Sequence, residues 1–215
     1  MNDRDAISRR MREHFEDFWS AGDPWQLEQS ALDQTRYARQ HALVNDRRYA
    51  RALDLGCGSG QFTRLLADVA DHVVGVDIAQ AAIDRAAVTC RGKHNVELRV
   101  ANVMDDDYSK AESWDLIVMT ESIYCLGWLY PMFDVGWLVS ELLGSMRAGG
   151  RFLLVNTLGT ETDYLLLPWL IKTYRDLFLN VGYELEREES LRGTKNGVEL
   201  EVAMSLLRKP AAGNP

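Results

Sequence analysis

The sequence has few cysteines and histidines. Its three cysteines, Cys57, Cys90 and Cys125, are spaced too widely for a zinc motif, and their odd number argues against a disulfide framework. The four histidines show no metal-binding spacing. We therefore expect no metal, and we expect reduced thiols in a cytosolic protein.

Clustered basic residues and long apolar runs are also missing. The chain carries 24 Lys and Arg against 32 Asp and Glu, for a net charge of -8, and no Lys/Arg cluster offsets this acidic balance. Binding to phosphate backbones or anionic lipid depends on local positive charge. No run reaches the length of a membrane span, and Met1 to Asp5 contains no apolar signal region. We expect a cytoplasmic protein without nucleic acid or membrane as a partner.

What the chain does have is enough apolar sequence for one full domain. Its 215 residues are 47% apolar and 26% charged, and they contain no repeat, linker or low-complexity tract. The prediction is a single domain over residues 1–210. Residues 1–47 form a helical lid, residues 48–210 form the ligand-binding core, and residues 211–215 form a disordered tail.

The stretch around which the chain is organised runs from Arg51 to Phe62. An apolar run, Ala52 to Leu55, predicts a short buried strand, and three glycines at alternate positions then precede a helical pattern. Glycines in such a turn permit positive φ and let a ligand approach the main chain, while the first amides of the next helix stay free. The pattern favours a nucleotide-like ligand, although strand–glycine–helix junctions also occur without one.

The glycine spacing distinguishes between two ligand classes. Dinucleotide folds use G-x-G-x-x-G, whereas this turn has G-x-G-x-G, with Gln61 where the third glycine would fall. Asp54 also places a carboxylate where a pyrophosphate would be repelled. A cationic ligand suits the site better.

The segment Leu-Asp-Leu-Gly-Cys-Gly-Ser-Gly, residues 53–60, resembles the first motif of the class I methyltransferases that use S-adenosylmethionine. In that family the turn lies beside the amino acid moiety and the ribose of the cofactor. The resemblance therefore implies S-adenosylmethionine as cofactor, with S-adenosylhomocysteine as product. It implies these turn residues as cofactor contacts: Asp54, Gly56, Cys57, Gly58 and Gly60.

A second buried strand, His72 to Asp77, ends in a carboxylate that follows Gly60 by 17 residues. An acidic residue at this position can accept hydrogen bonds from both ribose hydroxyls. The alternative is that Asp77 caps the helix that starts near Ala79. We include Asp77 and its neighbour Ile78 among the expected cofactor contacts.

The third predicted strand, Val96 to Val100, leads to Asn102 and Val103. In similar methyltransferases a polar residue just after this strand, most often Asp, meets the adenine amino group. The carbonyl oxygen of Asn102 can accept from that amine, but without the assistance of a charge. Asn102 and Val103 join the expected cofactor contacts.

The fourth predicted strand, Trp114 to Met119, is followed by Glu121 and Tyr124. This Glu-x-x-Tyr pattern resembles several small-molecule methyltransferases, above all the nodulation-type (NodS-like) N-methyltransferases, and the likeness extends to Asp23-Pro24-Trp25. We expect Glu121 and Tyr124 to orient the methyl acceptor, with Glu121 also reaching the cofactor. The alternatives are a helix N-terminal charge for Glu121 and core packing for Tyr124.

Two helices are predicted before the first strand. One spans Asp5 to Trp19 and ends near Gly22, and the other spans Trp25 to Val44. They have to pack against something, and the free place is above the carboxyl ends of the strands, where they would act as a lid. We expect Trp25 and Arg36 to contact the cofactor from this lid, although apolar residues of helical stripes are usually core and Arg36 could face solvent.

The remaining pattern completes an α/β fold. It predicts a helix at Met132 to Met146, a strand at Arg151 to Asn156, a helical region between Leu158 and Val181 that Pro168 interrupts or restarts, and strands at Tyr183 to Glu189 and Val198 to Leu207. The expected fold class is a Rossmann-like, seven-stranded, mainly parallel sheet. It has a C-terminal antiparallel hairpin, helices on both faces and two N-terminal lid helices.

The expected chemistry follows from the cofactor. Transfer from a sulfonium is an in-line displacement of an already activated methyl group, so the protein has chiefly to align the nucleophile and exclude water. We expect transfer to a small molecule, with the amine of an amino sugar or related metabolite preferred. The alternatives are O-methylation of a sugar, phenol or carboxylate, an NAD-dependent oxidoreductase, and a cofactor-binding regulatory or scaffold protein.

Overall fold

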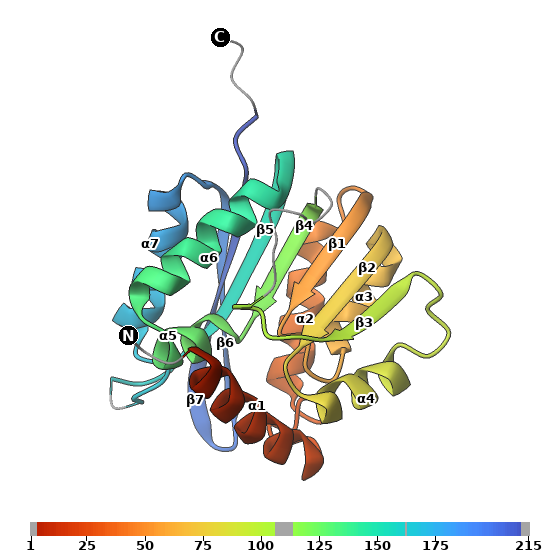
Figure 1. Cartoon of the computed structure of the whole chain (residues 1–215), viewed down its shortest axis with the longest axis vertical. Helices are drawn as coiled ribbons and strands as arrows, with labels where there is room; N and C mark the ends of the chain where they lie inside the picture. The colour runs from red at the N-terminus through yellow and green to blue at the C-terminus, as the bar shows by residue number, and fades with distance from the viewer. Residues whose placement is uncertain (1–3, 106–113, 162, 212–215) are drawn as a thin grey trace. The chain divides into compact units, whose positions relative to one another are not determined.

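Helices and strands alternate along most of the chain in the computed structural model, which describes residues 4–105, 114–161 and 163–211 (Figure 1). The contacts divide the chain into two compact units, residues 1–106 and 107–215. Of the predicted disordered tail, only Ala211 is among the described residues.

Unit 1 contains four helices and three strands. In chain order they are α1 Arg4–Ser20, α2 Ala31–Val44, β1 Tyr49–Leu55, α3 Gln61–Val69, β2 Ala70–Asp77, α4 Gln80–Thr89 and β3 Val96–Val100. The strands lie in the order β3-β2-β1 and all run parallel. The second halves of β1 and β2 are buried, as expected for parallel strands with helices on both faces.

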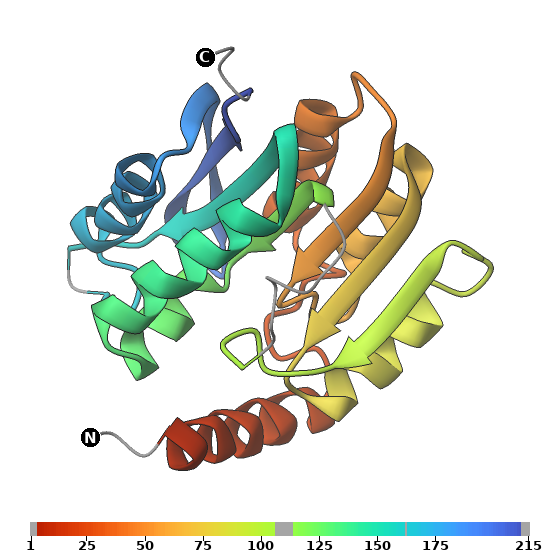
Figure 2. The same ribbon diagram turned by 45° about the horizontal axis from the view of Figure 1, so that its top comes forward.

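The strand register brings the glycine turn to the end of β2. Asp54 lies opposite Gly75 and Leu55 lies opposite Val76, so β1 ends one residue before β2 reaches Asp77. The carboxyl ends of parallel strands share one edge of a sheet, and this edge is where α/β folds bind ligands. Helix α1 runs past the carboxyl ends of β2 and β3, as Figure 2 shows.

The first predicted helix is confirmed, but the start of the second was wrong. Helix α1 ends at Ser20, and Gly22 follows with φ +130°. Residues 21–30 form turns, in which Gln26 has φ +52°, and α2 begins only at Ala31. Ser30 fixes this start, because its hydroxyl accepts from the amide of Asp33 at 3.2 Å and caps the helix.

The described residues of unit 2 form three helices and four strands. They are β4 Trp114–Thr120, α5 Ile123–Leu129, α6 Met132–Ser145, β5 Met146–Leu158, α7 Pro168–Val181, β6 Glu184–Lys195 and β7 Val198–Arg208. The strands lie in the order β4-β5-β7-β6, with β4 and β5 parallel and both pairings of β7 antiparallel. The predicted fold class, Rossmann-like and mainly parallel with a terminal hairpin, is confirmed.

Two local predictions in unit 2 are corrected. The short helix α5 was not predicted, because seven residues are too few to establish a helical period. The helical region after Leu158 begins only at Pro168, which occupies the first turn, where its fixed φ is favourable and its missing N–H is not needed.

Helix α7 packs on one face of β5. The Phe152 ring lies 4.8 Å from that of Phe178 and 5.6 Å from that of Tyr183. Because side chains alternate along a strand, Leu154 and Asn156 share this face with Phe152, and Thr157 points to the other. None of the described helices is both long and apolar enough to cross a membrane.

Candidate active site

The glycine turn has the backbone that the sequence predicts. Gly56, Gly58 and Gly60 all have positive φ, at +73°, +52° and +76°. The amides of Gly56 and Cys57 both donate to the carbonyl of Val76, at 2.8 and 2.9 Å. The turn is therefore attached to the end of β2, in a conformation that residues with a Cβ rarely adopt.

Two of these glycines are also needed for close packing. A Cβ at Gly58 would lie 2.8 Å from Cζ2 of Trp19, and a Cβ at Gly60 would lie 2.9 Å from Cβ of Ala86. Gly60 thus allows α3 to approach α4. At Gly58, the group that approaches the main chain is the indole of α1.

Asp54 is a buried carboxylate at the foot of the turn. Only 2% of the residue is exposed, and its Oδ2 accepts from the hydroxyl of Thr63 at 2.6 Å. Burial raises the pKa of Asp54 from 3.8 to about 6, and the hydrogen bond from Thr63 opposes that rise. A nearby cation would offset the cost of burying this negative charge. Asp54 is therefore suited to the cationic ligand that the sequence predicts.

Asp77 connects three segments of the site. Its Oδ2 accepts from the amide of Gly58 at 2.9 Å, and its Oδ1 accepts from the amide of Ala79 at 3.0 Å. Burial raises the pKa of Asp77, while these backbone hydrogen bonds oppose the rise. The contact with Ala79 lies before α4, because Ala79 is itself the N-cap residue of that helix, so Asp77 does not cap it. The backbone of Ile78 also hydrogen-bonds this carboxylate, and an ionised carboxylate can accept about four hydrogen bonds in all.

The segment after β3 places Asn102 at the same edge. Its amide nitrogen donates to the hydroxyl of Ser8 at 2.6 Å and to Oδ2 of Asp105 at 2.9 Å, while its oxygen accepts from the amide of Met104 at 3.0 Å. Ile78 and Val103 are buried beside these polar groups. The amide oxygen of Asn102 is an acceptor of the kind that an adenine amine requires.

Helix α1 is attached to this edge by polar contacts along its length. Arg4 donates to the carbonyl of Met104 at 3.2 Å, and Ser8 donates to Asp105 at 2.7 Å. Further along, both carboxylate oxygens of Glu16 accept from the amide of Ala81, at 3.2 and 3.3 Å. Glu16 therefore caps α4. The N-cap residue of this helix is Ala79, which makes no side-chain capping hydrogen bond.

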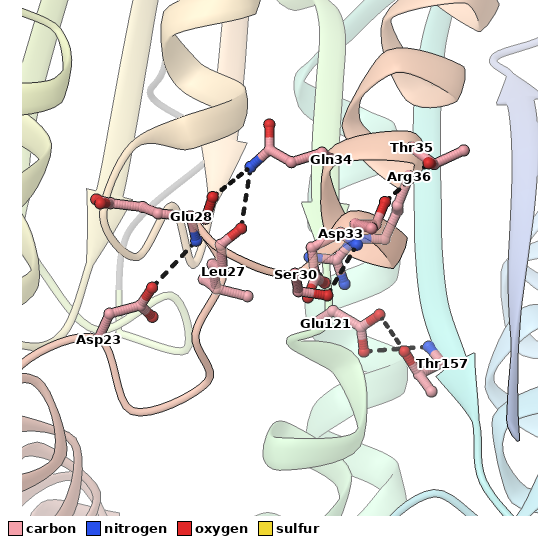
Figure 3. Close-up of polar contacts among 11 residues, drawn as sticks. Asp23, Leu27, Glu28, Ser30, Asp33, Gln34, Thr35, Arg36, Glu121 and Thr157 are labelled. Atoms are coloured by element: carbon pink, nitrogen blue, oxygen red, sulfur yellow. Dashed lines mark hydrogen bonds and ion pairs between the residues drawn. The ribbon is translucent and has the colours of Figure 1, made fainter. Parts of the chain in front are cut away.

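Trp25 and Arg36, the two lid residues expected at the cofactor, lie in different surroundings. Trp25 stacks on Phe18, with ring centroids 5.4 Å apart, and meets Trp19 edge-on at 5.2 Å. Arg36 is buried and pairs with Asp33 at 2.9 Å (Figure 3). Its guanidinium also lies over the ring of Tyr37. The expectation that Arg36 could face solvent is wrong.

In unit 2 the residue after β4 has an unusual backbone. Glu121 has φ +56°, a left-handed conformation that is uncommon outside glycine, and its amide donates to the carbonyl of Val155 at 2.8 Å. Thr157 holds the carboxylate through its amide at 3.1 Å and its hydroxyl at 2.7 Å (Figure 3). Tyr124 follows in the first turn of α5 and is half-buried.

Sequence reasoning missed four residues that shape these sites, Ser8, Glu16, Thr63 and Thr157. Thr63 carries a usable signal, because it falls in the first turn of the helix after the glycine motif, on the side of Asp54. The other three act across 36 to 97 residues of sequence, and no local pattern predicts such pairs.

A glycine turn follows β1, an acidic residue ends β2, and an antiparallel hairpin ends the chain's sheet strands. Together these features define the class I methyltransferase fold. The crystal structure of N-methyltransferase NodS from Bradyrhizobium japonicum WM9 in complex with S-adenosyl-L-homocysteine has this fold. It matches with a TM-score of 0.79 and 19% identity, over 93% of this chain and 98% of that one.

The family model for nodulation protein S (NodS) matches residues 10–140. Nodulation protein S of Rhizobium tropici is 31% identical over 135 residues, which cover 61% of this chain and 54% of that protein. The Bradyrhizobium diazoefficiens protein is 33% identical over 105 residues, covering 48% and 49%. The chain thus spans about half the length of these relatives. It belongs to the NodS family.

Proposed function

We propose that the protein transfers a methyl group from S-adenosylmethionine to the amine of a small molecule, preferably an amino sugar or related metabolite. The observation that carries the proposal is the buried carboxylate of Asp54 beneath the glycine turn. Burial without a cationic partner is costly. A sulfonium ligand with an ammonium group supplies the missing positive charge.

The residues of unit 1 fit such a ligand. The carboxylate of Asp77 would accept from the ribose, and the amide oxygen of Asn102 would accept from the adenine amine. Gly56, Cys57, Gly58 and Gly60 shape the backbone around the amino acid moiety, and the N-terminus of α3 has no side-chain cap among the described residues. The apolar side chains of Ile78 and Val103 would flank the base.

Residues 1–47 would form the lid over this cofactor, with a role for Trp25 and Arg36. The support is the position of α1, which contacts the glycine turn through Trp19 and the segment after β3 through Ser8. Burial of Arg36 places a fixed cation on the lid, suited to the carboxylate of the cofactor's amino acid moiety. A closed lid excludes water from the reacting sulfonium.

Glu121 and Tyr124 would orient the acceptor. When bound, S-adenosylmethionine supplies an activated methyl group, so the protein needs to present an unprotonated amine in line with it. Thr157 fixes the carboxylate of Glu121 with two hydrogen bonds, and a carboxylate is a suitable acceptor for the N–H groups of an amine. Glu121 follows the carboxyl end of β4, the edge at which α/β folds bind ligands.

The acidic charge balance supports a small-molecule acceptor rather than nucleic acid. Three free cysteines are consistent with a reducing compartment, and we propose a cytoplasmic location on that basis.

The test combines a binding measurement with a transfer assay. At about 100 times the dissociation constant, S-adenosylhomocysteine adds about 2.7 kcal/mol to the free energy of unfolding, which raises the melting temperature by about 5–11 °C. NAD should leave the melting temperature unchanged. Labelled methyl transfer to a panel of amines and alcohols then identifies the acceptor class. Binding without transfer to any acceptor overturns the catalytic proposal, and a shift with NAD alone overturns the cofactor.

A further inference from the structure

Unit 2 contains a polar cavity between α7 and the strands β5, β7 and β6. Its volume is about 340 Å³, within the range of about 300–1,000 Å³ that is usual for small-molecule sites. Its polar lining includes Asn156 of β5, Lys172 and Arg175 of α7, Glu188 of β6, and Glu201 of β7. We call this the α7 cavity.

Asn156 is the most unusual residue of the α7 cavity. Only 2% of it is exposed, and its Oδ1 has no hydrogen-bond partner within residues 4–105, 114–161 and 163–211. A buried amide oxygen without a partner has lost its hydration without a compensating hydrogen bond. A ligand with hydroxyl or N–H donors would supply that hydrogen bond.

The α7 cavity contains one weakly paired carboxylate. Glu188 and Glu201 point into it opposite Lys172 and Arg175 of α7, whereas the carboxylate of Glu189 lies on the other face of β6 and pairs with Arg187. Glu188 is neutralised by Arg175 at 3.2 Å and accepts from the hydroxyl of Ser205 at 3.3 Å. Within the described part of the chain, Glu201 pairs only with Arg192, whose side chain is 81% exposed. Such an exposed pair is weak, so Glu201 is available to a ligand's ammonium group.

The α7 cavity is distinct from the site assigned to methyl transfer. Asn156 and Thr157 are consecutive on β5, so their side chains point to opposite faces. Thr157 holds Glu121 on one face, and the cavity lies with α7 on the other.

We propose that the α7 cavity binds a small amine that carries several hydroxyl groups, as a second site apart from methyl transfer. The ammonium group lies at Glu201, and the hydroxyl groups satisfy Asn156. The cavity walls also contain Leu154 and Ile171, which cover the apolar face of such a molecule. This site does not depend on the proposed transfer activity.

The test is a titration of the full chain, labelled with ¹⁵N, with glucosamine as the probe. Saturable shifts are expected in the amides of residues 154–158, in α7 and in the β6–β7 hairpin. Glucose, which lacks the ammonium group, should bind about tenfold more weakly. Shifts confined to the glycine turn and Glu121 would place the ligand in the transfer site and overturn the proposal, as would glucuronate binding more tightly than glucosamine.

Two variants and a matched control make the assignment specific. Asn156→Leu and Glu201→Gln should each weaken glucosamine binding about tenfold. Glu201 is near the surface, so its variant remains informative if Asn156→Leu fails to fold. Glu199→Gln makes the same charge change on the same face of β7 outside the cavity lining, and it should change the affinity less than about twofold. Equal effects of the two Glu→Gln changes refute the site. Binding of S-adenosylhomocysteine, measured in parallel, reports separately on the proposed function.

Discussion

The indole of Trp19 lies against the backbone of Gly58, so closely that a Cβ on the glycine would be 2.8 Å from Cζ2 of the ring. Trp19 also packs on Ala79 and Ala82, beside the start of α4. One aromatic side chain therefore joins α1 to the glycine turn and to the helix after β2.

Gly58→Ala should destabilise the protein and loosen α1. The new methyl group meets both the ring of Trp19 and a φ of +52°, so a loss of about 2–4 kcal/mol in the free energy of unfolding is expected from overpacking and backbone strain. Urea denaturation measures it. Gly92→Ala is the control, because Gly92 has φ +85° with nothing within 4 Å of a Cβ, and should cost only about 1 kcal/mol. Equal losses would show that Trp19 does not restrict Gly58.

Asp54→Asn should stabilise the ligand-free protein at pH 8. The folded-state pKa of Asp54 is raised from 3.8 to about 6, so the folded protein binds more protons between these values and loses stability as the pH rises through them. Above pH 6 the ionised carboxylate lowers the free energy of unfolding by up to about 3 kcal/mol. The uncharged Asn side chain avoids this loss. The advantage of the variant should vanish below about pH 4. Denaturant unfolding from pH 4 to pH 8 measures the difference in unfolding free energy between the variant and the wild type. A difference that does not change with pH would contradict the raised pKa of Asp54.

The same substitution should weaken cofactor binding. Loss of the buried negative charge should reduce the affinity for S-adenosylmethionine about tenfold or more at pH 8. In the wild type, affinity should fall as Asp54 becomes protonated below about pH 6. Calorimetry at several pH values measures both effects, and Asp71→Asn, at an exposed site on β2, is the matched control.

Asp77→Ala should affect both stability and binding. It leaves the amides of Gly58 and Ala79 without their acceptor, at a cost of about 1–3 kcal/mol. The affinity for S-adenosylhomocysteine should fall at least tenfold if Asp77 also accepts from the ribose. The exposed Asp84→Ala serves as control for charge and helix context. A stability loss with unchanged affinity would leave Asp77 with its structural role alone.

Thr157→Val should slow transfer without weakening cofactor binding. The variant keeps the shape of the side chain but removes the hydroxyl that donates to Glu121 at 2.7 Å. A lost hydrogen bond to a charged group corresponds to about a tenfold or greater fall in kcat. Thr173→Val, on the exposed side of α7, is the control. An unchanged kcat would argue against a role for a fixed Glu121.

Glu16→Gln tests the attachment of α1. The uncharged amide is a weaker acceptor for the amide of Ala81 and loses the interaction with the helix dipole, so α1 should detach more readily by about 0.5–1 kcal/mol. Hydrogen exchange of α1 measures this opening, and the exposed Glu13→Gln is the control. If the two variants exchange alike, Glu16 does not hold the helix.

Much of the core was predictable from sequence because local patterns determine it. Positive φ at Gly56, Gly58 and Gly60 follows from residue type, and the strands around Asp54 and Asp77 follow from apolar runs. The start of α2 was predicted wrongly because the helical pattern continues through Ser30 from Trp25. The hydroxyl of Ser30 caps the helix by accepting from the amide of Asp33, three residues later. The hydrogen bonds of Glu16 and Thr157 could not be predicted, since each depends on a partner brought close only by the fold.

The attachments of α1 also have a consequence for how the chain is made. Arg4 and Met104 are separated by 100 residues, Ser8 and Asp105 by 97, and Glu16 and Ala81 by 65. Helix α1 therefore has no complete docking surface until the chain has been synthesised as far as Asp105. Because contacts of long sequence separation form late, α1 should dock last in unit 1. The apolar stripe of α1 is exposed throughout that interval. Helix α1 should therefore be the segment of unit 1 that depends most on chaperones during translation.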